Sequence, residues 1–531
     1  MACGVTSLAV IIPQFLIRSA DLLSKITSGA VLGIDAYVVE VEVDVTARGL
    51  PYFATVGLPD AAIKESKDRV RSALKNNGFD FPLKQIVINL APANIKKEGS
   101  AFDLPIALGI IASEGILRQE ALSGYMIVGE LSLDGRIKPV RGALPMAVKA
   151  SAEGFRGLIL PRGNAEEAAV VGGVDVYGAD DLASVVEFFR GEGILQKFSM
   201  DVSRLFLENS RYLEDFSEVK GQEHVKRALE IAAAGGHNVL MIGPPGSGKT
   251  MLARRLVTVL PDMGFDEAIE TTKVHSVAGL IPPDRPLVAT RPFRSPHHTI
   301  SDAGLIGGGA YPRPGEVSLS HNGVLFLDEL PEFHRNALEV LRQPLEDRQV
   351  TISRATASIT FPASFMLVAA MNPCPCGFHA DSSHRCACTP HQIQRYRARV
   401  SGPLLDRIDL HVEVPSVKYR ELSDDRPGES SEKVRERVNK ARAAQVKRLN
   451  EDGIYCNSQM KPRHLKRFCA LDDKTHSLLE NAVERLGLSA RAYNRIIKVA
   501  RTIADLANRE SIQARDVSEA IQYRSLDRKL I

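Results

Sequence analysis

The chain has 531 residues, of which 44% are hydrophobic and 25% charged, a typical composition for globular protein. One hydrophobic core does not usually fill this length, so we expect two to four domains. No apolar run approaches the ~20 residues of a membrane-spanning helix, which argues against a membrane protein. The formal net charge is only +3, but residues 416–531 hold 25 Lys and Arg against 17 Asp and Glu. This excess suits a polyanionic partner, and equally a solvated helical surface.

The first residues of the chain do not have the pattern of a folded domain. They include an apolar stretch of signal-peptide length without a basic start. Residues 1–22 are therefore interpreted as a disordered extension or a misassigned start, and not as a secretion signal. Cys3, Cys456 and Cys469 are scattered and outline no disulfide framework, which favours the cytoplasm.

Residues 23–190 predict a complete α/β domain. Apolar and polar side chains alternate from residue 31 to residue 58, as in half-buried strands. Asp60 is placed to cap a helix, and the segment KQIVINLAP predicts a further strand. An apolar helix is expected over residues 103–114.

The rest of the chain predicts a linker, a second α/β domain and a helical region. Residues 191–217 lack clear periodicity and are interpreted as the linker, residues 218–415 as the second domain, and residues 416–531 as a set of helices. In one of these helices Val434, Val438, Ala441 and Leu449 fall on one side. In another, the arginines are expected on a different face from Ile496, Ile497, Ala500, Ile503 and Ala504.

The segment GPPGSGKT is the most informative in the chain. It follows a short apolar run, residues 239–242, and precedes a predicted helix. In such a P-loop the glycines let backbone N–H groups close around phosphate oxygens, the lysine reaches the β- and γ-phosphates, and the threonine ligates Mg²⁺. The sequence thus predicts a site for ATP and Mg²⁺ at Gly243, Pro244, Pro245, Gly246, Ser247, Gly248, Lys249 and Thr250.

A second apolar strand, in GVLFLDE, ends in two acidic residues. Carboxylates at a strand tip are costly unless they meet a cation or a water that needs activating. We assign Asp328 to the Mg²⁺ shell and Glu329 to polarising the attacking water.

These motifs, with the asparagine that ends FMLVAAMN and with SGPLLDRIDL, resemble the AAA+ ATPases of the magnesium-chelatase-like branch. The resemblance implies a sensor at Asn372 that orients the water, a second sensor at Arg491, and an arginine finger at Arg407. The finger would reach the γ-phosphate of a neighbouring subunit, so the resemblance also implies a hexameric ring. For either arginine alone, a surface salt bridge explains the residue equally well.

Two insertions also match this branch. Residues 291–323 include His297-His298, and the segment RQVTISRATASITF alternates on both sides of Arg354 as in a hairpin. The resemblance implies that both insertions line the pore of the ring, and we assign Arg354 to contact with DNA phosphates. The adjacent histidines lack the spacing of a helical metal site and are interpreted as loop packing or substrate contact.

The N-terminal domain resembles the Lon-protease-like fold, of the ribosomal S5 type, in KKEGSAFDLPIALGIIAS and VGELSLDGRIKPVRG. Lon proteases use a serine and a lysine, but an ungapped comparison places Ala101 and Leu144 at these positions. A shifted dyad of Ser100 with Lys138 or Lys149 is the alternative. Because a nucleophile without its base is nearly inert, we interpret the domain as a platform for DNA binding or assembly.

A Lon-like domain before a chelatase-like AAA+ module with a helical lid is the arrangement of the ComM/YifB family, which the chain resembles from about Leu23 onward. The resemblance implies a bacterial cytoplasmic ATPase that moves along single-stranded or branched DNA, catalyses branch migration during natural transformation, and works with recombination proteins. Two rival functions are a metal-insertion ATPase like magnesium chelatase and a protein unfoldase or peptidase. The Lon-like domain and the lack of an integrin-type module argue against the first, and the lack of an aromatic residue in VHSVAGLIPPDRPL argues against the second.

Four of the seven cysteines follow the proposed sensor, in the pattern Cys-x-Cys, nine residues, Cys-x-Cys. Four thiolates suit a tetrahedral Zn²⁺ that orders a loop of low apolar content. A redox pair and unmetallated thiols are the alternatives, and His379 and His384 are substitute ligands. The predicted zinc site consists of Cys374, Cys376, Cys386 and Cys388.

Overall fold

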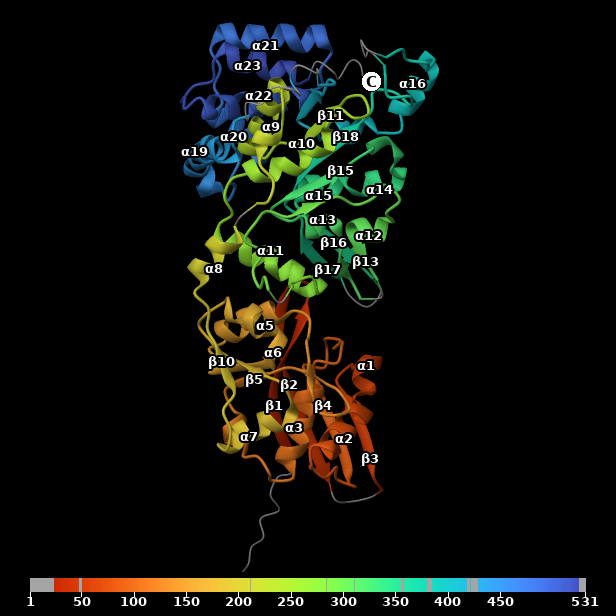
Figure 1. Cartoon of the computed structure of the whole chain (residues 1–531), viewed down its shortest axis with the longest axis vertical. Coiled ribbons are helices and arrows are strands. Elements are labelled where there is room, and N and C mark those ends of the chain that lie inside the picture. The colour runs from red at the N-terminus through yellow and green to blue at the C-terminus, as the bar shows by residue number, and fades with distance from the viewer. Residues whose placement is uncertain are drawn as a thin grey trace, which may run out of the picture. The chain divides into compact units, whose positions relative to one another are not determined.

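The computed structural model forms two compact units (Figure 1). The N-terminal unit contains residues 23–30 and 36–199, and the C-terminal unit contains residues 31–35 and those from 200 onward. The expected extension, residues 1–22, lies outside the described part of the chain. The structure describes residues 23–46, 50–210, 212–282, 284–309, 311–354, 358–379, 384–417, 421 and 428–524. Both units combine helices and sheets, which confirms the predicted α/β class.

The first sheet of the N-terminal unit has the strand order β1-β2-β4-β3. β2 runs antiparallel to β4, whereas β3 runs parallel to it. Alternate residues of β2 and β4 are buried in one core with α2 and α3. Asp60 accepts a hydrogen bond from the Ile63 backbone N–H at 2.9 Å and so caps α1, as predicted. The elements are β1 (Leu23–Leu32), β2 (Asp35–Thr46), β3 (Tyr52–Val56), α1 (Ala61–Lys64), α2 (Ser66–Asn76), β4 (Gln85–Ala91) and α3 (Asp103–Ser113).

The second sheet of this unit has the order β10-β9-β8-β5 and is parallel except for its edge strand β10. β10 and α8 lie within the segment that was interpreted as a linker, so the start of residues 191–217 is part of a sheet. A three-residue edge strand is too short to show a period in the sequence. The elements are α4 (Gln119–Leu122), β5 (Tyr125–Ile127), β6 (Glu130–Leu131), β7 (Ile137–Lys138), α5 (Ala143–Ala152), β8 (Gly157–Pro161), α6 (Arg162–Ala169), β9 (Asp175–Ala179), α7 (Leu182–Arg190) and β10 (Gln196–Phe198), and α8 (Val202–Asn209) follows as the first helix of the C-terminal unit.

The C-terminal unit is built on a five-stranded parallel sheet of order β12-β15-β18-β11-β19. Every residue of β11, β15 and β18 is buried, as expected for strands that are covered on both faces. The carboxyl ends of these three adjacent strands therefore share one edge of the sheet. The strands are β11 (Val239–Ile242), β12 (Phe293–Arg294), β15 (Val324–Leu327), β18 (Met366–Met371) and β19 (Leu410–Glu413).

Two small hairpins accompany this sheet. β13 (Gly307–Gly308) pairs with β14 (Arg313–Pro314), and β16 (Gln349–Ser353) pairs with β17 (Ser358–Pro362). The second pairing confirms the predicted hairpin, although residues 355–357 at its tip are outside the described chain. The helices of the core are α9 (Glu223–Gly235), α10 (Lys249–Leu256), α11 (Phe265–Ala278), α12 (Asp302–Ile306), α13 (Glu316–Leu319), α14 (Arg335–Val340), α15 (Arg342–Asp347), α16 (Pro390–Arg397) and α17 (Gly402–Leu405).

The last part of the C-terminal unit is a helical lid that shares its apolar core with α9 and β11. The residues expected on the buried sides of α19 and α22 are buried, which confirms both patterns. None of the described helices has the length and apolar character needed to cross a bilayer. The lid consists of α19 (Ser431–Leu449), α20 (Pro462–Phe468), α21 (Asp473–Leu486), α22 (Ala490–Leu506) and α23 (Ala514–Gln522).

The arginines of α22 are predicted on another face than its apolar residues, but the side chain of Arg501 is buried with them and is only 1% exposed. Arg501 pairs with Asp505 at 3.0 Å and donates to the carbonyl oxygens of Arg509 and Glu510. Asp505 also accepts from Arg448 at 2.5 Å. A buried guanidinium is stable here because acceptors from the following loop surround it.

We expect Asp505→Asn to lower the free energy of unfolding of the C-terminal unit by about 3 kcal/mol, because it leaves buried cations without their counter-charge. The matched control is Glu436→Gln, which breaks the exposed pair with Lys440 and should cost less than about 1 kcal/mol. Urea denaturation of both variants measures the difference. Equal losses would contradict the assignment of a buried ion pair.

Candidate active site

The loop between β11 and α10 has the backbone conformation of a phosphate-binding loop. Gly246 and Gly248 have φ angles of 75° and 89°, which residues with a side chain rarely adopt. At Gly243 a Cβ atom would lie 2.1 Å from the carbonyl oxygen of Val414, so only glycine fits there. The loop leads directly into the N-terminus of α10, where unpaired N–H groups and the helix dipole favour an anion.

Lys249 is buried, and its ammonium group is turned back into the loop. It donates to the carbonyl oxygens of Gly243 at 2.8 Å and Pro244 at 2.9 Å, and to Oδ1 of Asn372 at 3.2 Å. Burial lowers the pKa of Lys249, while Asp328 and Glu329 act in the opposite direction. All three acceptors are neutral, so a phosphate in the loop would give this cation a stronger partner.

The hydroxyl of Ser247 is buried and has no hydrogen-bond partner among the described residues. The backbone of the same residue is fixed, because its carbonyl oxygen accepts from the Gln222 amide at 3.0 Å. An unpaired polar atom inside a fixed loop is costly unless a ligand completes its bonding. The loop therefore fits a phosphorylated ligand.

The acidic pair and Asn372 lie at the same sheet edge as the P-loop, because β15, β18 and β11 are parallel neighbours. The Thr250 hydroxyl donates to Oδ2 of Asp328 at 2.6 Å. Hydroxyl and carboxylate oxygens are ligands that Mg²⁺ prefers. The structure thus brings together Lys249, Thr250, Asp328 and Asn372 from three separate segments of the sequence.

Glu329 follows Asp328 in a left-handed backbone conformation, with a φ angle of 53°. Its side chain is 57% exposed, and Oε2 lies 3.4 Å from Nδ1 of His298. The ring of His298 stacks on that of His297, with centroids 4.1 Å apart. The sequence did not indicate this contact, because His298 precedes the acidic strand in an irregular segment. A histidine from the first insertion thus lies beside the proposed catalytic acid.

Arg407 and Arg491 share a cavity that the P-loop does not line. Both line a cavity of about 1160 Å³ in the C-terminal unit, and this lining contains no residue of Gly243–Thr250. The Arg407 side chain is only 10% exposed, because it pairs with Glu346 and donates to the carbonyl oxygen of Pro403 at 2.8 Å. The sequence alone does not reveal Glu346 as its partner.

Asp409 joins the segment of Arg407 to helix α22. Its carboxylate accepts from Arg495 at 2.8 Å and lies 3.1 Å from Nδ1 of His237, whose Nε2 is 2.9 Å from the Thr502 hydroxyl. Burial by itself would raise the pKa of Asp409, but the charge of Arg495 and the contact with His237 outweigh it and hold the pKa well below its usual range. The carboxylate is therefore ionised and fixed between the core and the lid.

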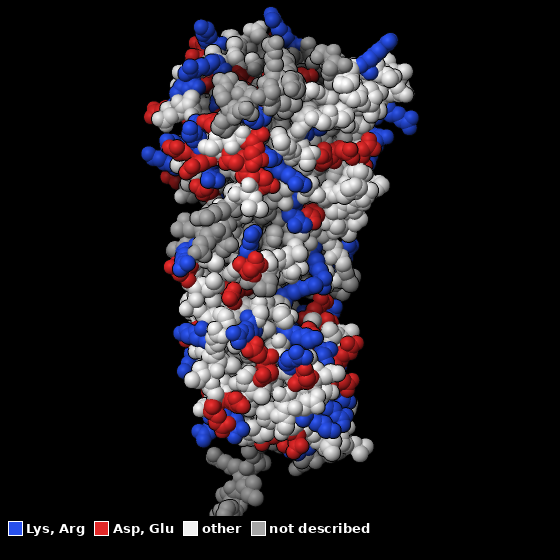
Figure 2. Space-filling model, in the orientation of Figure 1, with Lys and Arg blue, Asp and Glu red and all other residues white. Residues whose placement is uncertain are grey.

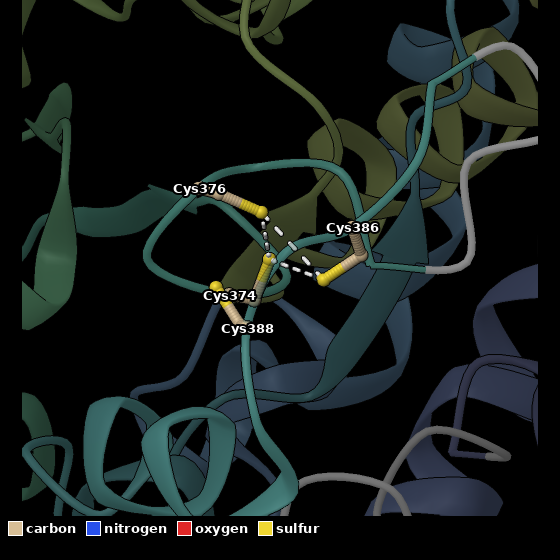
Figure 3. Close-up of side chains that lie close together, drawn as sticks. All are labelled: Cys374, Cys376, Cys386 and Cys388. Atoms are coloured by element: carbon tan, nitrogen blue, oxygen red, sulfur yellow. Dashed lines mark hydrogen bonds between the residues drawn. The ribbon is translucent and has the colours of Figure 1, made fainter.

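The four clustered cysteines meet at one point (Figure 3). Their Sγ atoms all lie within 4.8 Å of one another, and the group includes neither His379 nor His384. Cys374 is buried, and all four thiols are free of disulfide bonds. The predicted ligand set is thus assembled by the fold.

Arg354 is exposed where the β16–β17 hairpin begins its tip. A Cβ atom on Gly308 would lie 3.5 Å from its guanidinium, so the second hairpin lies beside the first. The basic excess of the lid is largely paired within the unit, and Figure 2 shows positive and negative side chains interspersed over its visible face. Lid arginines bonded to acids or to backbone carbonyls include Arg435, Arg437, Arg442, Arg448, Arg495, Arg501 and Arg509.

The N-terminal unit does not bring a serine and a lysine together. Ser100 donates its hydroxyl hydrogen bond to Glu130, and Lys149 pairs with Glu153 at 2.6 Å. Lys138 is exposed, and Leu144 is buried. Among the described residues of this unit no hydrogen bond joins a serine to a lysine, so the shifted dyad is not formed.

Family models of magnesium chelatase match most of the chain. The model for "Magnesium chelatase, subunit ChlI" matches residues 215–422, that for "Subunit ChlI of Mg-chelatase" residues 41–164, and that for "Magnesium chelatase, subunit ChlI C-terminal" residues 428–524.

Individual proteins match over greater lengths. The competence protein ComM of Haemophilus influenzae is 47% identical over 513 residues, which are 96% of this chain and 98% of that protein. The uncharacterized protein YifB of Escherichia coli is 45% identical over 512 residues, with the same shares. Lon protease 2 of Bacillus subtilis is 31% identical over 150 residues, 27% of each chain.

We expect Thr250→Val to lower ATP turnover on the order of a hundredfold, because it removes the hydroxyl that Asp328 binds and that Mg²⁺ requires. Thr250→Ser keeps the hydroxyl and should retain most of the turnover. Steady-state ATPase assays over a range of Mg²⁺ concentrations compare the two. Equal turnover in both variants would show that the hydroxyl has no part in the site.

Proposed function

Because this chain belongs to the family of AAA+ ATPases that includes ComM and YifB, we propose that it is an ATP-driven motor that acts on DNA. In this proposal it forms a hexameric ring in the cytoplasm and moves along single-stranded or branched DNA. It catalyses branch migration when incoming DNA recombines with the chromosome during natural transformation, together with recombination proteins. The name of the Haemophilus relative, a competence protein, supports this role.

The observation that carries the proposal is the meeting of Lys249, Thr250, Asp328 and Asn372 at one sheet edge. Lys249 would leave its neutral acceptors and bind the β- and γ-phosphates of ATP. Mg²⁺, held by Thr250 and Asp328, supplies charge neutralisation when bound. Glu329 would polarise the attacking water and Asn372 would orient it, because both follow strands that end beside the loop.

Hydrolysis in this proposal needs a second subunit. Arg407 and Arg491 share a cavity that contains no P-loop residue, so both arginines would serve the nucleotide of a neighbour. Arg407 would exchange Glu346 for the γ-phosphate of that nucleotide when subunits assemble. An arginine that acts in this way requires a neighbouring subunit, and a closed ring gives every nucleotide site such a neighbour.

The two adjacent hairpins are the proposed DNA-contacting elements. Arg354 is exposed at the tip of one of them, and His298 of the first insertion contacts Glu329. A movement of the insertion would therefore reach the catalytic acid directly. Contact with phosphates alone suits a motor that must act on any sequence.

The rival functions have less support. A peptidase of this type needs a serine in contact with a lysine, and the described residues of the N-terminal unit contain no such contact. Ser100 is instead bound to Glu130. The core shared with magnesium chelatase supports ATP hydrolysis and does not by itself select a substrate. We propose ATP and Mg²⁺ as cofactors, with Zn²⁺ at the four cysteines.

Mixing two inactive variants tests whether each active site contains residues of two neighbouring subunits. Arg407→Ala keeps Glu329, and Glu329→Gln keeps Arg407, so a mixed ring contains complete sites wherever the first lies next to the second. Random mixing should restore roughly a quarter of the sites, and ATPase activity should return accordingly. The double variant mixed with Arg407→Ala restores none and is the control. An absence of recovery in rings that demonstrably mix would contradict catalysis across subunits.

Stimulation of ATP turnover identifies the substrate. We expect forked and single-stranded DNA to raise turnover, with an apparent affinity whose logarithm falls linearly with the logarithm of salt concentration. Arg354→Ala should reduce both the stimulation and the salt slope, whereas Lys440→Ala, an exposed lysine of the lid, should change neither. If casein or a porphyrin stimulates ATP turnover and DNA does not, the proposal of a DNA motor is wrong.

A further inference from the structure

The segment between Asn372 and α16 contains a compact group of thiols. Cys374 Sγ lies 3.3 Å from Cys376 Sγ and 3.8 Å from Cys386 Sγ, and the last two are 3.6 Å apart. Cys388 completes the group within 4.8 Å of the others. Figure 3 shows the four sulfur atoms pointing toward a common centre, two from a tight turn and two from the returning chain.

These separations fit one metal ion. Zn²⁺ binds thiolate at about 2.3 Å, so the corners of a ZnS₄ tetrahedron are ~3.8 Å apart. A disulfide would need a sulfur–sulfur distance of about 2.05 Å. An iron–sulfur cluster contains several irons and would spread its thiolates further apart. We propose that Cys374, Cys376, Cys386 and Cys388 bind a single tetrahedral Zn²⁺ that holds the active-site loop in place.

The surroundings of the thiols explain why the chain would use a metal here. The described residues from Pro373 to Thr389 form no helix or strand, and most of them are exposed or half-buried. Such a segment cannot bury enough apolar surface to fix its own backbone. Four metal–thiolate bonds supply that free energy in small zinc-binding loops.

The metal site would lie directly against the P-loop. The Gly377 N–H donates to the carbonyl oxygen of Cys374 at 3.0 Å, which closes the turn that carries the first two cysteines. Gly377 has a φ angle of 87°, and a Cβ atom there would lie 2.5 Å from Cδ of Pro245. The turn is thus packed on the P-loop without room for a side chain.

The same turn fixes the proposed sensor. Cys374 is buried two residues after Asn372, whose side chain binds Lys249 at 3.2 Å. Arg397 donates to the carbonyl oxygen of Pro373 at 3.2 Å and anchors the turn from α16. A Zn²⁺ in this position would keep Asn372 in a fixed position relative to Pro245 of the P-loop. This second step rests on the proposed ATPase function, whereas the metal site itself does not.

Metal content tests the site on the full chain. Protein purified under reducing conditions without chelator should contain one zinc per chain by elemental analysis. Growth with Co²⁺ should give the thiolate charge-transfer and visible bands of tetrahedral cobalt. Replacing all four cysteines by serine should abolish both signals, Cys388→His should retain the metal, and Cys456→Ser, a buried cysteine outside the group, should leave it unchanged. Three results would contradict the proposed zinc site: iron in place of zinc, a disulfide between two of the thiols, or no metal in the reduced protein.

A separate readout tests the positioning role. In the four-serine variant we expect ATP turnover to fall at least about tenfold while binding of a fluorescent ATP analogue, which also reports a folded P-loop, is kept. Normal ATP turnover in a zinc-free variant would contradict the positioning role of the metal but would not contradict the zinc site itself. Loss of analogue binding together with turnover also contradicts the positioning role. If the zinc-loaded wild type hydrolyses no ATP, the proposed function fails and the metal site stands.

Discussion

The parallel pairing of β18 with both β11 and β15 is the constraint on which the active site depends. Ile242 lies opposite Met371, and Leu327 lies opposite Ala369. Because the three strands run in the same direction, the P-loop, Asn372 and the acidic pair must leave the sheet at one edge. All three strands are fully buried, so a shift of register by one residue would disrupt packing on both faces. The hydrophobic core thus sets the distance between Thr250 and Asp328.

A second, polar constraint joins the core to the lid. Asp409 binds Arg495 and His237, and His237 contacts Thr502 in the same helix, α22. Buried and fully bonded polar groups of this kind specify one arrangement, because a shifted arrangement leaves charges unpaired. Arg407 precedes Asp409 by two residues, and Arg491 is the second residue of α22. The ion pair between Asp409 and Arg495 therefore links the segment of the proposed finger to the helix of the second sensor, which favours their acting on the same nucleotide.

Local patterns predicted much of this structure. The P-loop, the acidic strand, the hairpin around Arg354 and the buried sides of α19 and α22 follow from short-range periodicity and glycine chemistry. What the sequence could not reveal depends on partners distant along the chain. Arg501 lies four residues after Ile497, at the border of the apolar face of α22, and the carbonyl groups beyond the helix that accept its hydrogen bonds cannot be foreseen from that spacing.

The same reason explains the other differences from expectation. Glu346 and His298 are unremarkable until the fold places them beside Arg407 and Glu329. The positive charge counted in the lid overestimates what a polyanion would meet, because many of its arginines neutralise internal acids or bind internal carbonyls. A charge count cannot separate these two uses of arginine, since both need the same side chain.

Asn372 shows how a single polar side chain can be held from two directions. On its N-terminal side, β18 fixes Asn372 through the sheet, and the backbone amide of Asn372 hydrogen-bonds the Tyr396 hydroxyl. Burial raises the pKa of Tyr396 to about 12, so the tyrosine that makes this contact is neutral at physiological pH. On its C-terminal side the described residues from Pro373 to Thr389 form no helix or strand, and of these only Cys374 and Gly377 are buried. Catalytic groups need support on all sides to keep their geometry. Four thiols around one ion would complete that support where a hydrophobic core is absent.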